Sequence, residues 1–438
     1  MRFRHISALA LALLFTSTLT AATIHVAPSA GMRDEALTDF RVTGLAPLQE
    51  ITLRARTSDL PGTPWSSEAR FAADANGVVD VAKDHPRGGS YRGADIMGPL
   101  WSLKTADEFA LAFMLIGAFP MGTFQVALEV ADASGSVLAQ TTITRRSASA
   151  ELPVTRELWS PLGYEMALYY PTHQPPKETV VHITGSGGGR LEGFCEMLAA
   201  HGYFAACVPY FGMPGTPATL TEVPLEHFRD AIDAVLEHPH AVGGEVVFSG
   251  VSRGGEGALL VGSTYPERIK AVLGFMPAAY VWDAETAGAS AWTLGGTPLP
   301  YLSVSYEHLF KFNPGFPWIV TPTFRYSEAI ATPEQRAAAR IPVEQIDGPV
   351  FLSSGLKDQL CPCDESADTV AATLRAAGHP HPVVNIKGPQ AGHLAFNVAY
   401  TPVPQTVALI YECGGTPEGN AAAAAAQWRE LLRFLGDL

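Results

Sequence analysis

Hydrophobic and polar residues follow two different patterns along this chain, and the change falls near residue 150. Before it, apolar residues alternate with polar ones, as over 51–55, 124–130 and 137–143, and clusters of Gly, Pro, Asp and Asn separate these runs. Such alternation is typical of strands with one buried face. Short strands at this spacing predict an antiparallel β-sandwich of immunoglobulin type over 23–150.

Beyond residue 150, apolar runs alternate with segments expected to be helical, as a doubly wound parallel sheet requires. After a first strand over 164–170, we expect strands at 180–184, 204–208, 246–249, 271–275, 350–354 and 383–386. Helices are expected near 191–201, 225–237, 254–265, 364–377 and 421–435. The sequence therefore predicts a second, α/β domain over 151–438.

A long segment separates the expected strands at 271–275 and 350–354, and long loops without function are uncommon. The segment is rich in aromatic residues, which can wall an apolar pocket. We predict a cap insertion over about 282–345, and the alternative is core packing with a surface loop. The aromatic residues concerned are Trp282, Trp292, Tyr301, Phe310, Phe312, Phe316, Trp318 and Phe324.

The N-terminus has the composition of a secretory signal. Arg2 and Arg4 precede an apolar run over 8–15 that is too short to span a bilayer, and small residues follow at 20–22. The sequence predicts a signal peptide over 1–22, cleavage near Ala22 and export to the periplasm or beyond. No second apolar segment follows, so no membrane span is expected in the mature form.

The composition of the chain indicates a folded protein and excludes some classes of binding partner. The chain has 438 residues, 47% of them hydrophobic, which suits two domains with buried cores. Its net charge of −14 argues against nucleic acid and anionic membranes as partners.

The chain has five cysteines, Cys195, Cys207, Cys361, Cys363 and Cys413, which an exported protein can oxidise. Cys361 and Cys363 are separated by one proline, which is too short a spacing for a comfortable bridge between them. Neither a His nor a further Cys stands beside them for a metal site. We therefore expect one of the two to pair with Cys413.

The strongest motif is the run from Gly250 to Gly254, which has a serine at its centre, Ser252. An apolar strand precedes it and a helix of small residues follows, which is the context of the nucleophile elbow of α/β-hydrolases. Two glycines allow the tight turn that lifts the serine hydroxyl above the sheet. A plain Gly-rich turn is the alternative, so the partners of the serine must appear downstream.

A serine needs an imidazole to accept its proton and a carboxylate to orient that imidazole, in the chain order Ser, acid, His. Asp358 follows an apolar strand and a glycine turn, whereas its rivals Asp364 and Asp368 fall in the next helix. His393 follows the last strand in a Gly-His loop. His379 and His381 precede that strand and are expected to be solvated turn residues.

The developing oxyanion needs backbone amides as donors. One is the amide of Arg253, the residue after the serine. The other is expected in the glycine-rich loop over 185–189, from Ser186 or Gly187. A phosphate-binding loop is the alternative for this segment, but it lacks the Lys-Ser/Thr ending.

Taken together, these residues resemble the acyl-CoA thioesterase and bile acid-CoA:amino acid N-acyltransferase family. The likeness lies in 51–56, 65–71, 88–91 and 97–102 of the first half, and in 185–189, the elbow, Asp358, His393 and 414–417 of the second. The resemblance implies acyl transfer from a thioester. It further implies that a Cys nucleophile passes the acyl group to glycine or taurine whereas a Ser hydrolyses, so Ser252 points to a hydrolase. Arg253 stands where many relatives have Lys.

The sequence therefore predicts an acyl-CoA thioesterase-like serine hydrolase that acts on a small-molecule substrate, an acyl thioester of the acyl-CoA kind or an ester, and needs no metal or organic cofactor. Because coenzyme A is scarce where exported proteins act, a carboxylesterase or lipase on oxygen esters is the first alternative. An acyl-CoA:amino acid N-acyltransferase and a binding module with an inert triad are the others.

Overall fold

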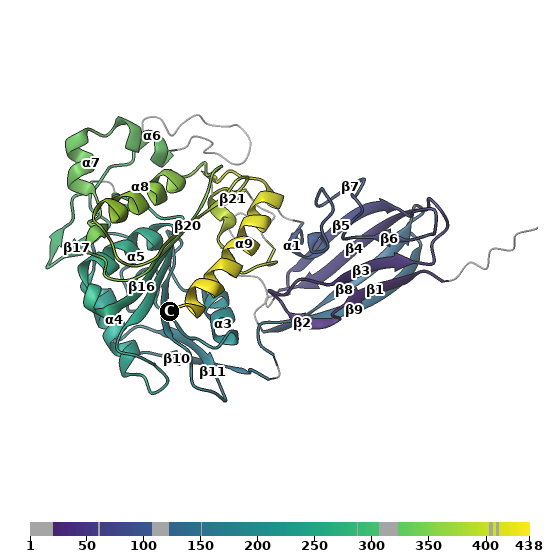
Figure 1. Cartoon of the computed structure of the whole chain (residues 1–438), viewed down its shortest axis with the longest axis horizontal. Coiled ribbons are helices and arrows are strands. Elements are labelled where there is room, and N and C mark those ends of the chain that lie inside the picture. Colours follow the sequence, from purple (N-terminus) through teal and green to yellow (C-terminus); the bar gives the residue numbers. More distant parts are fainter. Residues whose placement is uncertain are drawn as a thin grey trace, which may run out of the picture.

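The computed structural model of the chain describes residues 21–59, 62–106, 122–149, 151–286, 288–305, 323–402, 406–408 and 411–438. The predicted signal peptide lies almost entirely outside these residues. Figure 1 shows a β-rich N-terminal region, in purple and blue, beside a larger region in which helices surround a central sheet.

Two sheets make up the N-terminal region. One has the order β1 (Thr23–Ala27), β3 (Asp39–Thr43) and β6 (Val79–Asp80). The other has the order β2 (Ala30–Met32), β9 (Val137–Arg146), β8 (Thr123–Asp132), β4 (Glu50–Ser58), β5 (Pro64–Ala72) and β7 (Gly88–Gly89), and the short helix α1 (Gly98–Trp101) follows β7 in the chain.

Alternation in the sequence explains how the two sheets meet. Along β5 every second side chain is buried, as expected for a strand with one face on a core. Phe40 of β3, Leu53 of β4 and Leu128 of β8 all belong to one apolar cluster, so the two sheets enclose a common core. Assignment to the immunoglobulin type stays a prediction.

The second region is built on one eight-stranded sheet. Its order is β10 (Val154–Trp159), β11 (Met166–Pro171), β13 (Phe204–Cys207), β12 (Thr179–Ile183), β15 (Val246–Val251), β16 (Ile269–Phe275), β19 (Val350–Gly355) and β20 (Val383–Gly388). The strands from β13 to β20 in this order pair in parallel, whereas β11 pairs antiparallel with both β10 and β13 and so runs against the other strands. The predicted α/β class is therefore confirmed, although the edge strand β10 escaped prediction.

Helices cover both faces of this sheet, because successive side chains of each strand point to opposite sides. Val181 and Phe248 pack in the same cluster as α4 (Glu226–Glu237), α5 (Arg253–Thr264) and α8 (Cys363–Ala376). Their neighbours Val180 and Val247 pack with α3 (Glu192–Ala200) and α9 (Pro417–Gly436) on the other side. Helix α9 begins four residues before its expected start because the Thr416 side chain caps it by accepting from the Gly419 amide.

The insertion between β16 and β19 is described only in part. It contains β17 (Trp292–Leu294), β18 (Thr297–Pro298), α6 (Thr323–Ile330) and α7 (Pro333–Ala339), and β17 pairs with β14 (Val223–Pro224). Trp292 is fully buried in the main core, stacked on Tyr210, so it does not wall a pocket. Phe310, Phe312, Phe316 and Trp318 lie outside the described residues, and the cap stays a prediction.

A buried polar cluster joins the two regions. The carboxylate of Asp34 lies 2.6 Å from Nε2 of His201 and accepts a 2.7 Å hydrogen bond from the Trp428 indole of α9. Beside it, the buried guanidinium of Arg33 donates to the Gly193 carbonyl of α3 at 2.7 Å. Burial raises the pKa of Asp34, but the hydrogen bonds from His201 and Trp428 outweigh it and lower the pKa overall.

Asp34→Ala should therefore destabilise the chain by about 1–3 kcal/mol, because it leaves the buried Trp428 indole unsatisfied and removes the partner of the partly exposed His201. Urea unfolding followed by tryptophan fluorescence measures the loss. Asp39→Ala removes an exposed carboxylate paired with Arg41 and serves as the control, with only a small expected change. Equal stability of the two variants would contradict the joining role of Asp34.

Candidate active site

Ser252 occupies the sharp turn between β15 and α5. Its φ of 58° and ψ of −120° lie in a region that L residues rarely adopt, and its amide donates to the Phe275 carbonyl at 2.8 Å. A Cβ on Gly250 would lie 2.0 Å from the Gly254 oxygen, and one on Gly254 would lie 2.1 Å from the Thr184 oxygen. Any side chain at either position would clash with these backbone atoms, so both positions require glycine, as the motif predicts.

The structure brings the three predicted side chains together. His393 Nε2 lies 2.9 Å from Ser252 Oγ, and His393 Nδ1 lies 2.7 Å from Asp358 Oδ2. Asp358 Oδ1 accepts from the amides of Leu360 and Cys361 at 2.8 and 3.0 Å, which fixes the carboxylate behind the imidazole. Asp358 and His393 are both buried, so water competes little for their contact.

The rival residues lie elsewhere. Asp364 pairs with Arg325, and Asp368 pairs with Lys387. His379 contacts the Gly348 carbonyl, and His381 contacts Asp347. Chain order and the strand-then-turn context therefore selected the two residues, Asp358 and His393, whose side chains the fold brings to Ser252.

A segment near the C-terminus, over 411–416, ties the acid loop to the histidine loop. The Cys413 carbonyl accepts from the amides of His393 and Gln359 at 2.9 and 3.3 Å, and Gly414 forms a bridge with Asp358. Gly414 has φ +74°, and a Cβ there would lie 2.0 Å from the Lys357 oxygen. The sequence contained this Gly-Gly element, but its positioning role could not be inferred without the fold.

The predicted oxyanion donors belong to two segments next to the serine. The Arg253 amide stands at the first position of α5, where helix amides have no partner within the helix. A Cβ on Gly185 would lie 3.0 Å from the Ser252 Cβ, so the 185–189 loop packs against the serine. Ser186 and Gly187 are exposed in this turn, and their amides make no backbone hydrogen bond within the described chain. Which of the two donates stays a prediction.

Directly beneath the elbow lies a buried ion pair that the sequence analysis missed. Arg253 Nη1 lies 2.8 Å from Glu256 Oε2, and the same guanidinium donates to the carbonyls of Trp282 and Asp283. Glu256 Oε1 accepts from the Trp292 indole at 2.6 Å. Burial, offset in part by Arg253, raises the pKa of Glu256 to about 7. The i,i+3 spacing of Arg253 and Glu256 on the expected helix could have predicted this pair from the sequence.

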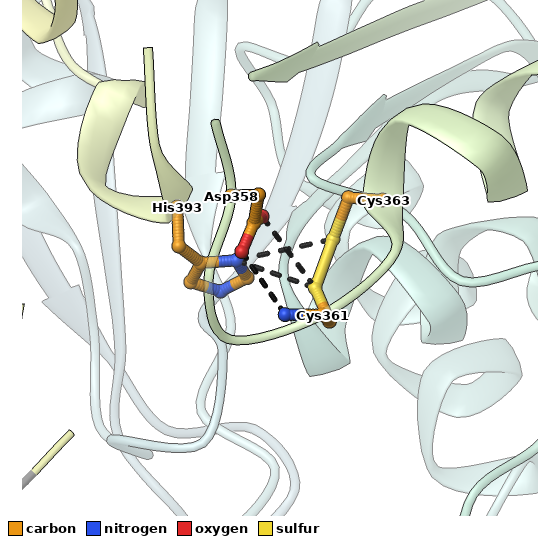
Figure 2. A group of neighbouring side chains, drawn as sticks. All are labelled: Asp358, Cys361, Cys363 and His393. Carbon is orange, nitrogen blue, oxygen red and sulfur yellow. Dashed lines mark hydrogen bonds and ion pairs between the residues drawn. A yellow bond between two sulfur atoms is a disulfide. The ribbon is translucent and has the colours of Figure 1, made fainter. Parts of the chain in front are cut away.

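The cysteines pair differently from the prediction. Cys195 bonds to Cys207, and Cys361 bonds to Cys363, so the expected bridge to Cys413 is wrong. The turn through Pro362 at the start of α8 brings the Cα atoms of Cys361 and Cys363 to 5.4 Å, within the range of ordinary disulfides. This disulfide lies beside Asp358 and His393 (Figure 2), so the prediction that no histidine accompanies it is also wrong.

The sheet order, the serine elbow and the residues around it define an α/β-hydrolase. Residues 35–156 match the family described as the acyl-CoA thioester hydrolase/BAAT N-terminal region, and residues 223–437 match its BAAT / acyl-CoA thioester hydrolase C-terminal counterpart. The chain belongs to this family. At the level of the family, the predicted resemblance and the thiolester-hydrolase class are confirmed.

Relatives extend over almost the whole chain. Mouse acyl-coenzyme A thioesterase 2, mitochondrial, is 27% identical over 95% of this chain and 89% of its own. Mouse peroxisomal succinyl-coenzyme A thioesterase is 26% identical over 95% and 96%. Among solved structures, a Pyrobaculum calidifontis esterase gives a TM-score of 0.37 at 16% identity, covering 65% of this chain and 83% of that one.

The predicted export is contradicted by these relatives, whose names place them in mitochondria and peroxisomes. The physical basis of the prediction was weak, because two arginines before a short apolar run are not specific to secretory signals. Across the described residues, no helix combines the length and the hydrophobicity needed to cross a bilayer.

Gly414→Ala should displace the acid and histidine loops, because its Cβ would overlap the Lys357 carbonyl. We expect a lower melting temperature and a loss of Ser252 labelling by a fluorophosphonate probe. Gly378→Ala is the matched control: Gly378 has φ +72° but no atom within 4 Å of its Cβ, so it should cost only about 1 kcal/mol and keep the labelling.

Glu256→Gln should change how stability depends on pH. The pKa of Glu256 is raised from 4.5 to about 7, so between these values the folded chain holds a proton that the unfolded chain has lost. The wild-type melting temperature should therefore fall relative to the variant as pH rises through this range, and the difference should level off above it. Exposed Glu267→Gln is the control and should show no such trend; a constant difference for Glu256→Gln would contradict the raised pKa.

Proposed function

We propose that this chain hydrolyses acyl thioesters of the acyl-CoA class through a covalent acyl-enzyme on Ser252. The observation that carries the proposal is the pair of contacts at His393, 2.9 Å to the serine hydroxyl and 2.7 Å to the Asp358 carboxylate. Membership of the acyl-CoA thioester hydrolase/BAAT family supports the thioester as substrate class.

The chemistry follows from these positions. With Nδ1–H donated to Asp358, the lone pair on His393 Nε2 accepts the Ser252 proton while Oγ attacks the thioester carbonyl. The amides of Arg253 and of Ser186 or Gly187 stabilise the oxyanion. His393 then returns the proton to the leaving thiol. Water, activated by the same imidazole, attacks the acyl-enzyme and releases the acid.

An assay of several acyl donors distinguishes a thioesterase from an oxygen esterase and from an N-acyltransferase. Purified chain is given palmitoyl-CoA, p-nitrophenyl palmitate, or palmitoyl-CoA with glycine or taurine, and the products are identified by mass spectrometry. We expect free fatty acid and thiol from palmitoyl-CoA, without amide. A large preference for the oxygen ester, or amide as the main product, would contradict the proposal.

Asp358→Asn should lower kcat for the preferred acyl donor about 10⁴-fold, because the amide holds the imidazole in the wrong tautomer. Asp368→Asn is the matched control, since this exposed acid pairs with Lys387 and should leave kcat nearly unchanged. Ser252→Ala should abolish acyl-enzyme formation, observed as the lost mass increment in a quenched reaction. Comparable kcat for Asp358→Asn and Asp368→Asn would remove Asp358 from the mechanism.

A further inference from the structure

Four side chains able to ligate a metal, one of them His393 itself, meet around the Nδ1 atom of its imidazole. One ligand atom from each of Asp358, Cys361, Cys363 and His393 lies within 4.8 Å of all the others (Figure 2). Cys361 Sγ is 3.3 Å from His393 Nδ1 and 3.7 Å from Asp358 Oδ2, and Cys363 Sγ is 3.8 Å from the same nitrogen. Three of the four residues are buried, and Cys361 is partly buried.

Two thiolates, one imidazole and one carboxylate form a donor set that suits Zn²⁺. Bonds of about 2.0–2.3 Å in a tetrahedron hold neighbouring ligand atoms about 3–4 Å apart, which is the spacing of the Cys–His and Cys–Asp contacts. The two sulfurs, however, are joined in a disulfide, and the thiolate is the form of cysteine that binds metals.

We propose that reduction of the Cys361–Cys363 disulfide opens a Zn²⁺ site made of Cys361, Cys363, His393 Nδ1 and Asp358, and that Zn²⁺ bound there switches the hydrolase off. That Zn²⁺ binds is inferred from the geometry of this cluster. That bound Zn²⁺ inhibits hydrolysis rests on the proposed function.

The steps balance with a dithiol as reductant. The dithiol gives two electrons and two protons to the disulfide and becomes a disulfide itself, while the Cys361–Cys363 bond breaks to give two thiols. Zn²⁺ then replaces the two thiol protons, which leave to solvent. It also replaces the proton on His393 Nδ1, and Nε2 gains one, so the imidazole stays neutral.

This shift of the proton explains the inhibition. In the active arrangement Nδ1–H faces Asp358, and the free lone pair of Nε2 accepts the Ser252 proton. With Zn²⁺ on Nδ1, the neutral imidazole carries its proton on Nε2 and can only donate to Ser252. The serine then has no base.

The surroundings hold the ligands independently of the disulfide. Asp358 Oδ1 is held by two backbone amides, which leaves Oδ2 for the metal. The His393 amide is bound to the Cys413 carbonyl at 2.9 Å. Cys363 is the first residue of the 14-residue helix α8, whose N-terminus favours a thiolate. Supporting contacts of this kind orient metal ligands in proteins.

Zinc stoichiometry tests the site without any assay of activity. The full chain carrying Ser252→Ala is reduced with dithiothreitol, desalted without air, dialysed against Zn²⁺ and analysed for metal. We expect about one Zn²⁺ per reduced chain, and none for oxidised chain or for Cys361→Ser/Cys363→Ser. The matched control Cys195→Ser/Cys207→Ser removes the other disulfide and should bind like the parent. Co²⁺ in place of Zn²⁺ should give thiolate charge-transfer bands only where Zn²⁺ binds.

Turnover of the wild-type chain tests the switch. Zn²⁺ should lower kcat of the reduced enzyme about 100-fold or more, and EDTA should restore it, whereas the oxidised enzyme and Cys361→Ser/Cys363→Ser should respond little. Reduced chain that binds no more Zn²⁺ than Cys361→Ser/Cys363→Ser would overturn the site. Stoichiometric Zn²⁺ with full turnover would overturn the switch. A chain that binds Zn²⁺ but hydrolyses no acyl donor would refute the proposed function and leave the metal site standing.

Discussion

The strained backbone of Ser252 is the constraint on which the rest of this active site depends. A φ of 58° costs a non-glycine residue of the order of 1–3 kcal/mol, so surrounding contacts must hold it. The Ser252 amide bonds to β16, and Gly250 and Gly254 let the start of α5 and the backbone of Ile183 and Thr184 at the end of β12 approach within contact distance. One turn thereby positions Ser252, the Arg253 amide and the start of α5 together. The buried pair of Arg253 and Glu256 anchors this turn to the insertion that follows β16.

Asp358 and His393 are held by different contacts. Asp358 and His393 follow neighbouring parallel strands, β19 and β20, so both emerge at the carboxyl edge of the sheet where Ser252 also lies. The strand order alone does not fix how the two side chains are oriented. The segment over 411–416 holds the loops that carry them, because the Cys413 carbonyl accepts hydrogen bonds from the amides of Gln359 and His393. The final helix, α9, follows this segment directly and joins the sheet to the N-terminal region through Trp428 and Asp34.

The disulfide beside His393 provides two sulfur atoms that can bind a metal together with the same imidazole. An imidazole that must carry its proton on Nδ1 for catalysis is also a metal ligand through that nitrogen. Two sulfurs within 4 Å of Nδ1 make the two uses compete. The redox state of one pair of cysteines can therefore decide between them, and this follows from the position of a short turn rather than from any long-range conformational change.

Much of this protein was determined by its sequence alone. Apolar runs, glycines at fixed offsets from Ser252, and the order of Asp358 and His393 predicted the α/β sheet and the three residues that meet, because periodicity and turn chemistry are local. The same local information misjudged the N-terminus and the cysteine pairs, and it was silent on Glu256 and on the role of Gly414. The N-terminus was misjudged because its composition is not specific to secretory signals. The other features depend on distances between residues apart in the chain, or, for Cys361 and Cys363, on the shape of one turn. Only the folded chain brings a carbonyl, a sulfur or a buried carboxylate to its partner.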